Sequence, residues 1–205
     1  MAHKELTDLH YLVDKGKRGK LKRKAGRLGY DVKSISRGVV HYQNQTTKDH
    51  VVSLKGTNPL NAKDLISDFK IAIGATNKDS QFKGRKKEIK KIYKNIPSNQ
   101  GVDLTSHSLG GSIATSIMAK SKSIRDRTGK AHTYNAGYTR ALHSELKKDL
   151  TPDDRAQLND KLVHHRISSD VVSEGLKHGS IGKVKTYKAK PDATLLESHS
   201  LSAFD

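Results

Sequence analysis

The chain has 205 residues, and 39 Lys and Arg against 21 Asp and Glu give it a formal net charge of +18. This length is typical of one domain with a core of its own, but 33% hydrophobic residues and a mean hydropathy of −0.73 predict a lean core. The absence of cysteine excludes disulfides and Cys-based catalysis. No stretch approaches the roughly 20 apolar residues that span a bilayer, and no signal peptide is expected at the N-terminus.

Residues 1–37 are predicted to form a basic arm in front of a domain of residues 38–205. From Lys15 to Arg27 there is no acidic residue and almost no apolar one, so this segment cannot build a core by itself. Such charge attracts anionic lipid headgroups and nucleic-acid phosphates alike. With no aromatic side chain to stack on a base, nucleic-acid contacts would be to the backbone. The cations expected to bind the polyanion are Lys17, Arg18, Lys20, Lys22, Arg23 and Lys24. A solvated or partner-covered loop is the alternative.

The rest of the chain predicts an α/β fold. Two β-rich runs, Gly38–Tyr42 and His50–Leu54, are joined by a polar turn and indicate a hairpin. Apolar residues then recur at helical spacing from Phe82 to Ile96, and Pro97 ends that helix. Further strands are predicted within residues 131–136, 159–167 and 183–188. The last of these alternates with lysines, as an edge strand does.

Residues 102–114 are the most informative segment, because they predict a short strand, a sharp turn and the start of a helix. In a nucleophile elbow of this kind a serine, here Ser108, projects above the sheet. The next backbone N–H, that of Leu109, then points at an oxyanion. The segment departs from G-x-S-x-G at Ser106, while Gly110 leaves the other side open. A glycine-rich turn with a helix-capping serine would show the same pattern.

Several motifs of the chain resemble those of the class 3 lipases, a branch of the α/β-hydrolases, and follow one another in the order that this family uses. The similar segments are Val51–Thr57, with Lys55 in place of an arginine, then Asp64–Phe69, the elbow, Ile167–Val172 and Glu197–Phe204. The resemblance runs from about residue 39 to the C-terminus. It implies a three-layer α/β-hydrolase-like fold with a mostly parallel central sheet and an N-terminal hairpin.

The resemblance also implies a catalytic triad of Ser108, Asp170 and His199. A serine hydroxyl is a weak nucleophile near neutral pH, so it needs a base, and the base needs an acid that orients it. The order serine, acid, histidine is the one that α/β-hydrolases use. Other histidines compete for the base: His107, expected beside the elbow, His164 and His165, expected to be structural, and His178, in the loop past the acid. The alternative for Asp170 and His199 is that both are surface residues of polar loops.

The family places the second oxyanion donor after the first motif, which implies Thr57 beside Leu109. Two such donors contribute several kcal/mol of transition-state stabilisation, although Gly, Asn and Pro around Thr57 are also typical of a plain turn. Residues 58–78 correspond to the lid of lipases and hold a single aromatic residue, Phe69. A small or charged ester, a phospholipid above all, is therefore expected in place of bulk triacylglycerol.

We expect a lipase- or phospholipase-type serine ester hydrolase that works through an acyl-enzyme, with no metal or cofactor, on a lipid or small carboxylic ester. Its basic segment would bind an anionic membrane or nucleic acid, and it would act in the cytoplasm or in association with a virion. The alternative is a non-catalytic structural protein that keeps a hydrolase-like scaffold and binds nucleic acid or a large assembly such as a virion. The complete triad favours the enzyme, and the departures at Ser106 and Lys55 favour the alternative.

Overall fold

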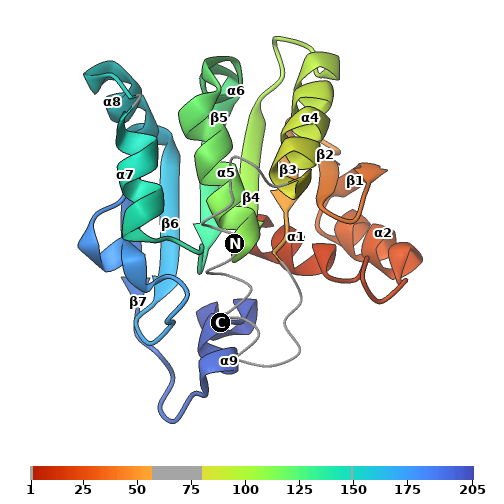
Figure 1. The fold of residues 1–205 in the computed structure, drawn as a ribbon. Helices are drawn as coiled ribbons and strands as arrows, with labels where there is room; N and C mark the ends of the chain where they lie inside the picture. Colours follow the sequence, from red (N-terminus) through yellow and green to blue (C-terminus); the bar gives the residue numbers. More distant parts are fainter. Residues whose placement is uncertain (1, 57–79, 149) are drawn as a thin grey trace.

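A seven-stranded sheet with helices on both faces forms the centre of the computed structural model, which describes residues 2–56, 80–148 and 150–205 (Figure 1). The strands lie side by side in chain order. They are β1 (Tyr30–Ile35), β2 (Val39–Asn44), β3 (His50–Leu54), β4 (Val102–His107), β5 (Thr128–Tyr134), β6 (Leu162–Ile167) and β7 (Lys183–Tyr187). The first three strands pair antiparallel and the sheet is parallel from β3 to β7. The fold is therefore the three-layer α/β-hydrolase-like class that the sequence predicts, with β2 and β3 as the hairpin.

Two apolar clusters cover the two faces of the sheet. One face packs against α4 (Ser80–Asn95), α5 (Leu109–Lys120), α6 (Lys122–Arg127), α7 (Arg140–Lys148) and α8 (Pro152–Lys161). The other face packs against α1 (Ala2–His10) and α2 (Arg18–Arg27). Neighbours such as Val39 and Val40 belong to different clusters, because successive strand residues point to opposite faces.

The remaining elements lie in the C-terminal part of the chain. Two 3-10 helices, η1 (Glu174–His178) and η2 (Leu201–Phe204), flank the short helix α9 (Leu195–His199). The predicted edge strand is confirmed as β7, which ends the sheet and is exposed along its whole length. Within the described ranges, no helix is both long and apolar enough to cross a bilayer.

Most of the segment predicted as a basic arm is folded onto the sheet. Leu21 and Ala25 are four residues apart on α2, so they share one helix face, and both are fully buried. They join Leu6 of α1 and Tyr42 of β2 in the second cluster. The segment has too few apolar residues for a core of its own, and it shares that of the sheet. The predicted boundary between residues 37 and 38 falls between β1 and β2, which are hydrogen-bonded neighbours.

A ladder of polar contacts fixes α1 along β4. His3 bonds to Asp103 (2.9 Å) and the hydroxyl of Thr7 to that of Thr105 (2.5 Å). One step further, the hydroxyl of Tyr11, the residue that follows α1, lies 2.6 Å from Nδ1 of His107. Four helical residues rise about 6 Å and two strand residues about 6.6 Å, so the two spacings nearly match. The N-terminal helix is thereby registered on the strand that leads to Ser108.

Leu21→Ala is expected to lower the free energy of unfolding by about 2 to 5 kcal/mol, because it empties a fully buried site between α2 and the sheet. Urea unfolding followed by circular dichroism measures this. The neighbouring exposed Lys22→Ala is the matched control and should change stability by less than about 0.5 kcal/mol. Equal, small effects of the two substitutions would mean that residues 1–37 are a detachable arm.

Candidate active site

Ser108 occupies a strained turn between the end of β4 and the start of α5. Its backbone has φ 54° and ψ −128°, in a region that residues other than glycine rarely adopt. Hydrogen bonds hold the turn on both sides. Ser108 N–H donates to the carbonyl of Tyr134 (3.1 Å), and the Ser108 carbonyl accepts from the N–H groups of Gly111 (2.8 Å) and Gly137 (3.2 Å). This is the strand-to-helix turn that the elbow motif predicts.

The end of β3 passes so close to this turn that only glycine fits there. A Cβ on Gly56 would lie 2.7 Å from Cβ of Ser108 and 3.1 Å from the backbone nitrogen of Leu109. A Cβ on Gly110 would collide with the carbonyl oxygen of Leu54. Leu109 is the first residue of α5, where a backbone N–H has no partner inside the helix. Thr57, the other predicted oxyanion donor, and the lid segment 58–78 lie outside the described residues.

Asp170 and His199 come together although 29 residues separate them. His199 Nδ1 donates to Asp170 Oδ1 (2.8 Å), and both side chains are buried. The backbone N–H of Ser173 donates to the other carboxylate oxygen (2.9 Å), which fixes the acid after β6. His199 is the last residue of α9, whose N-terminus carries a capping box formed by Thr194 and Glu197. A carboxylate on Nδ1 leaves Nε2 as the nitrogen that can accept a proton.

Two buried atoms of this region have no hydrogen-bond partner among the described residues: Ser108 Oγ and His199 Nε2. A buried polar atom left unpaired costs about 1 to 3 kcal/mol, so each one calls for an explanation, and a catalytic role is one such explanation. Four further atoms of this kind among the described residues belong to His10, Ser116, Arg155 and Arg166. Ser108 is not a helix-capping serine, because its side chain makes no capping hydrogen bond on α5. The structure records no hydrogen bond between the two atoms, a contact that in free enzymes often tightens only with substrate.

His107 and Asn135 hold the backbone of His199 from the sheet side. His107 Nε2 donates to the His199 carbonyl (2.8 Å), and Asn135 Nδ2 donates to the same carbonyl (3.1 Å) and to that of Ser198 (2.9 Å). Asn135 has φ 43°, a conformation that asparagine adopts more readily than most residues. Asn135 is not among the site residues that the sequence predicts. Its position at the end of a β-rich run, before Ala-Gly, was the available signal.

The competing histidines are engaged elsewhere. Both ring nitrogens of His107 are hydrogen-bonded, to Tyr11 and to the His199 carbonyl. His164 bonds to the hydroxyl of Thr133 (2.7 Å) and to the carbonyl of Ile181 (2.8 Å). His165 bonds to His132 (3.0 Å) and Tyr187 (2.8 Å). The side chain of His178 lies outside the described part of the chain.

The two departures from the lipase motifs are accommodated inside the fold. Lys55 is buried and forms an ion pair with Asp14, in the turn between α1 and α2 (2.5 Å). Ser106 is fully buried in β4, and its hydroxyl lies 3.4 Å from the carbonyl oxygen of His132. Across residues 2–56, 80–148 and 150–205, no group of three or more histidine, aspartate or glutamate side chains is arranged to hold a metal ion.

The six cations predicted to bind a polyanion lie on α2 or, in the case of Lys17, directly before it. Lys17, Arg18, Lys20, Lys22, Arg23 and Lys24 are all exposed. None of them forms an ion pair with a described acidic residue. Their positive charge is therefore not neutralised by the part of the chain that the structure describes.

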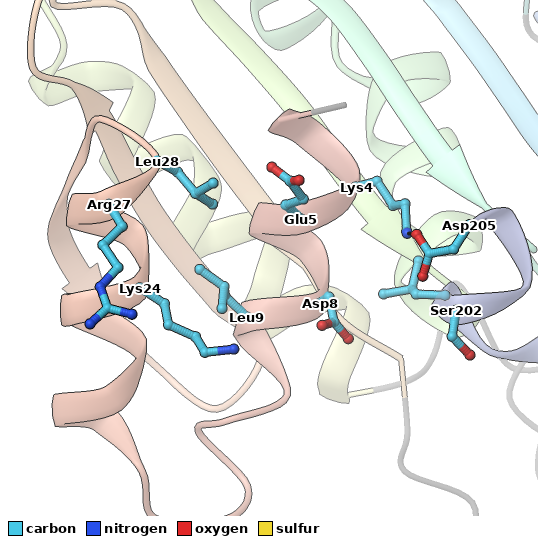
Figure 2. A pocket seen from close by; sticks show the side chains of 10 residues that line it. Lys4, Glu5, Asp8, Leu9, Lys24, Arg27, Leu28, Ser202 and Asp205 are labelled. Carbon is cyan, nitrogen blue, oxygen red and sulfur yellow. Dashed lines mark hydrogen bonds and ion pairs between the residues drawn. The ribbon is translucent and has the colours of Figure 1, made fainter.

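A cleft of about 430 Å³ lies between α1, α2 and η2. Figure 2 shows Lys24 and Arg27 on its α2 side, Glu5 and Asp8 on its α1 side, and Leu9 between the two helices. Opposite charges thus line its two walls. The cleft contains none of Ser108, Asp170 and His199. A smaller cleft, about 250 Å³, borders α9 and includes Glu197 and Ser198 in its lining.

Comparisons with known proteins give similarity to solved structures. No protein-family model and no curated protein matches the sequence. The chain is similar to a predicted CIB-like hydrolase from Thermoplasma acidophilum, with 11% identity, a TM-score of 0.47, and coverage of 85% of this chain and 92% of that one. It is also similar to an esterase from Pyrococcus furiosus, with 12% identity, a TM-score of 0.44, and coverage of 80% of this chain and 85% of that one. For a fungal lipase the identity is 15%, the TM-score is 0.44, and the coverage is 88% of this chain and 71% of that one. At these identities the likeness concerns the fold.

Stability is expected to fall in acid because five buried histidines and the half-buried His132 stay neutral in the fold. Burial is the largest cause that lowers each pKa from 6.5, to about 3 in His10, His107 and His165 and to about 4 in His41, His132 and His164. The unfolded chain therefore takes up protons first, and the free energy of unfolding drops as the pH falls below about 6.5 towards these values.

Urea midpoints measured from about pH 8 to about pH 4 follow this loss. Stability should be nearly constant above pH 7 and decline steadily below about 6.5. The variant His164→Gln removes one such group and should flatten the decline. A midpoint that stays level down to pH 4 would show that these histidines are not held neutral.

Proposed function

We propose that the chain is a serine hydrolase that cleaves carboxylic esters through an acyl-enzyme. One observation carries the proposal. The fold holds Ser108 in a strained turn at the C-terminal end of β4, and it pairs His199 with a buried carboxylate, so that the other imidazole nitrogen has no partner among the described residues. A purely structural turn would require neither the strain nor two unpaired buried polar atoms.

The proposed reaction divides ester hydrolysis into two transfers. Ser108 Oγ attacks the carbonyl carbon while His199 Nε2 takes the hydroxyl proton, and Asp170 stabilises the imidazolium through Nδ1. The tetrahedral intermediate collapses, the alcohol leaves with the proton from Nε2, and an acyl group remains on Ser108. Water then attacks the acyl carbon while Nε2 takes its proton. Nε2 returns this proton to Ser108 Oγ as the bond from Oγ to the acyl carbon breaks, which releases the carboxylic acid and free Ser108.

The negative oxygen of each intermediate needs fixed donors. Leu109 N–H stands at the first position of α5, next to the end of β3, and a donor at a helix N-terminus also benefits from the helix dipole. Thr57, which follows the close contact of Gly56 with Ser108, is proposed as the second donor. The buried Lys55–Asp14 ion pair holds the strand end that leads to it.

Exposed apolar residues that are close in sequence to Asp170 and His199 favour a lipid or other acyl substrate. Val171 follows the acid directly, and Leu195 and Leu196 lie on the helix that ends in His199; these side chains are 38%, 44% and 39% exposed. Side chains of this kind would provide apolar contacts for an acyl chain that reaches Ser108. We therefore retain the lipase- or phospholipase-type assignment implied by the resemblance to class 3 lipases.

Ser108→Ala and His199→Ala should each lower the turnover of a short p-nitrophenyl ester by at least about a thousand-fold, because the triad acts as a unit. Asp170→Asn should cost less than either, since the nucleophile and base remain. When the same samples are treated with a fluorophosphonate probe, the probe should label only the variants in which Ser108 and His199 are both intact. Circular dichroism melting controls for folding.

Wild-type turnover in Ser108→Ala would place the nucleophile elsewhere or assign the activity to a contaminant. An unlabelled, inactive wild-type protein would favour the second candidate function, a non-catalytic protein that uses the scaffold for binding. The exposed cations of α2 are the observation that favours this candidate.

We also propose that the exposed face of α2 binds a polyanion, either an anionic membrane or nucleic acid. Neutralising Lys17, Arg18, Lys20, Lys22, Arg23 and Lys24 to glutamine should sharply weaken binding to anionic vesicles and to duplex DNA. Turnover of a soluble ester should hardly change, because these side chains do not contact the candidate site. Wild-type binding should weaken steeply with added salt, since it is screened and releases counterions.

Vesicle and DNA binding measured at one ionic strength identifies the preferred polyanion. Tighter vesicle binding supports a phospholipase, and tighter DNA binding supports a role in a nucleic-acid-containing assembly such as a virion. Binding that neither salt nor the substitutions weaken would contradict the electrostatic surface.

A further inference from the structure

Tyr11 contacts both walls of the candidate site from outside the segments that resemble lipases. Its hydroxyl accepts a hydrogen bond from Gly56 N–H (3.3 Å) and lies 2.6 Å from Nδ1 of His107. Gly56 packs on Ser108, and His107 Nε2 donates to the carbonyl of His199. We propose that Tyr11 is a positioning residue that holds the oxyanion side and the base side of the site in a fixed relation; this inference rests on the proposed serine hydrolase function.

The hydrogen bonds of this network run in one direction, which leaves no conflict between donors. Since Nε2 of His107 donates to a carbonyl, a neutral ring presents Nδ1 as an acceptor. Tyr11 therefore donates its hydroxyl hydrogen to Nδ1, and its oxygen is free to accept from Gly56 N–H. The chain of bonds passes from the end of β3, through Tyr11 and His107, to the backbone of the residue that carries the base.

The surroundings of the two rings keep this arrangement in one protonation state. Burial lowers the pKa of His107 to about 3, so the ring stays neutral near neutral pH. Desolvation of the Tyr11 hydroxyl raises its pKa above the ordinary value of 10.0, so that group remains a donor. The network is thus maintained throughout the range in which a serine hydrolase works.

Tyr11 is placed by the polar ladder between α1 and β4. The contacts of His3 with Asp103 and of Thr7 with Thr105 fix how far α1 slides along the strand. Three residues beyond Tyr11, Asp14 binds Lys55, the residue before Gly56. The end of β3 is therefore held twice from the N-terminal segment, and Gly56 cannot move away from Ser108 without breaking these contacts.

Tyr11→Phe tests the inference because it removes one oxygen and keeps the ring. We expect kcat for a short ester, and the rate of fluorophosphonate labelling, to fall about ten- to a hundred-fold with KM nearly unchanged, as for a displaced catalytic group. Tyr42→Phe is the matched control. The Tyr42 hydroxyl also bonds α1, at the carbonyl of Leu6 (3.1 Å), but does not reach the site. It should lower the melting temperature and leave kcat near the wild-type value.

A double-mutant cycle with His107→Asn separates positioning from general loosening of the fold. If Tyr11 acts through His107, the two substitutions together should cost little more in kcat than the larger single effect. Fully additive effects, or wild-type kcat in Tyr11→Phe, would overturn the inference while labelling of wild-type Ser108 upholds the proposed function. A wild-type protein that neither labels nor turns over ester would contradict the proposed function itself, and this inference with it.

Discussion

The close passage of β3 against the turn at Ser108 is the constraint on which the candidate site depends. Gly56 and Gly110 leave no room for a side chain between the strand end and the turn. This contact brings the N–H of Leu109 beside the end of β3 and directs α5 back across the sheet. The strained backbone of Ser108 persists because α5 is buried along almost its whole length and its packing over-determines the turn.

Two of the four non-glycine residues with positive φ in the described part of the chain lie at the carboxyl edge of the parallel strands. Ser108 follows β4, and Asn135 follows the neighbouring β5; both have positive φ. Asn135 and His107 donate hydrogen bonds to the backbone carbonyl of His199, while Asp170, which follows β6, accepts one from its ring. Three adjacent strand ends thus supply one site, in agreement with the general position of ligand sites in α/β sheets. His199 is thus held by residues from the sheet and the strand ends as well as by the short helix that carries it.

Local sequence patterns were enough to predict much of this fold, but they did not predict contacts between distant residues. The hairpin of β2 and β3, the elbow and the exposed β7 follow from periodicity and turn residues within a few positions. The fold of residues 2–35 was harder to predict, because the two buried residues of α2, Leu21 and Ala25, stand among many charged residues. The resemblance to class 3 lipases predicted that Asp170 and His199 would pair, and the structure places them within hydrogen-bond distance. Nothing near Tyr11 or Asn135 in the sequence indicates partners as distant as His107 and Ser198.

The ladder between α1 and β4 also joins the start of the chain to a distant strand. Its contacts join residues 100, 98 and 96 positions apart, whereas β1, β2 and β3 pair with near neighbours. Closing loops of such length costs entropy before any contact can offset it. On the ribosome, moreover, β4 emerges long after α1. The three contacts of the ladder can therefore form only after β4 has been made, whereas Leu6 of α1 can already pack on Tyr42 of β2.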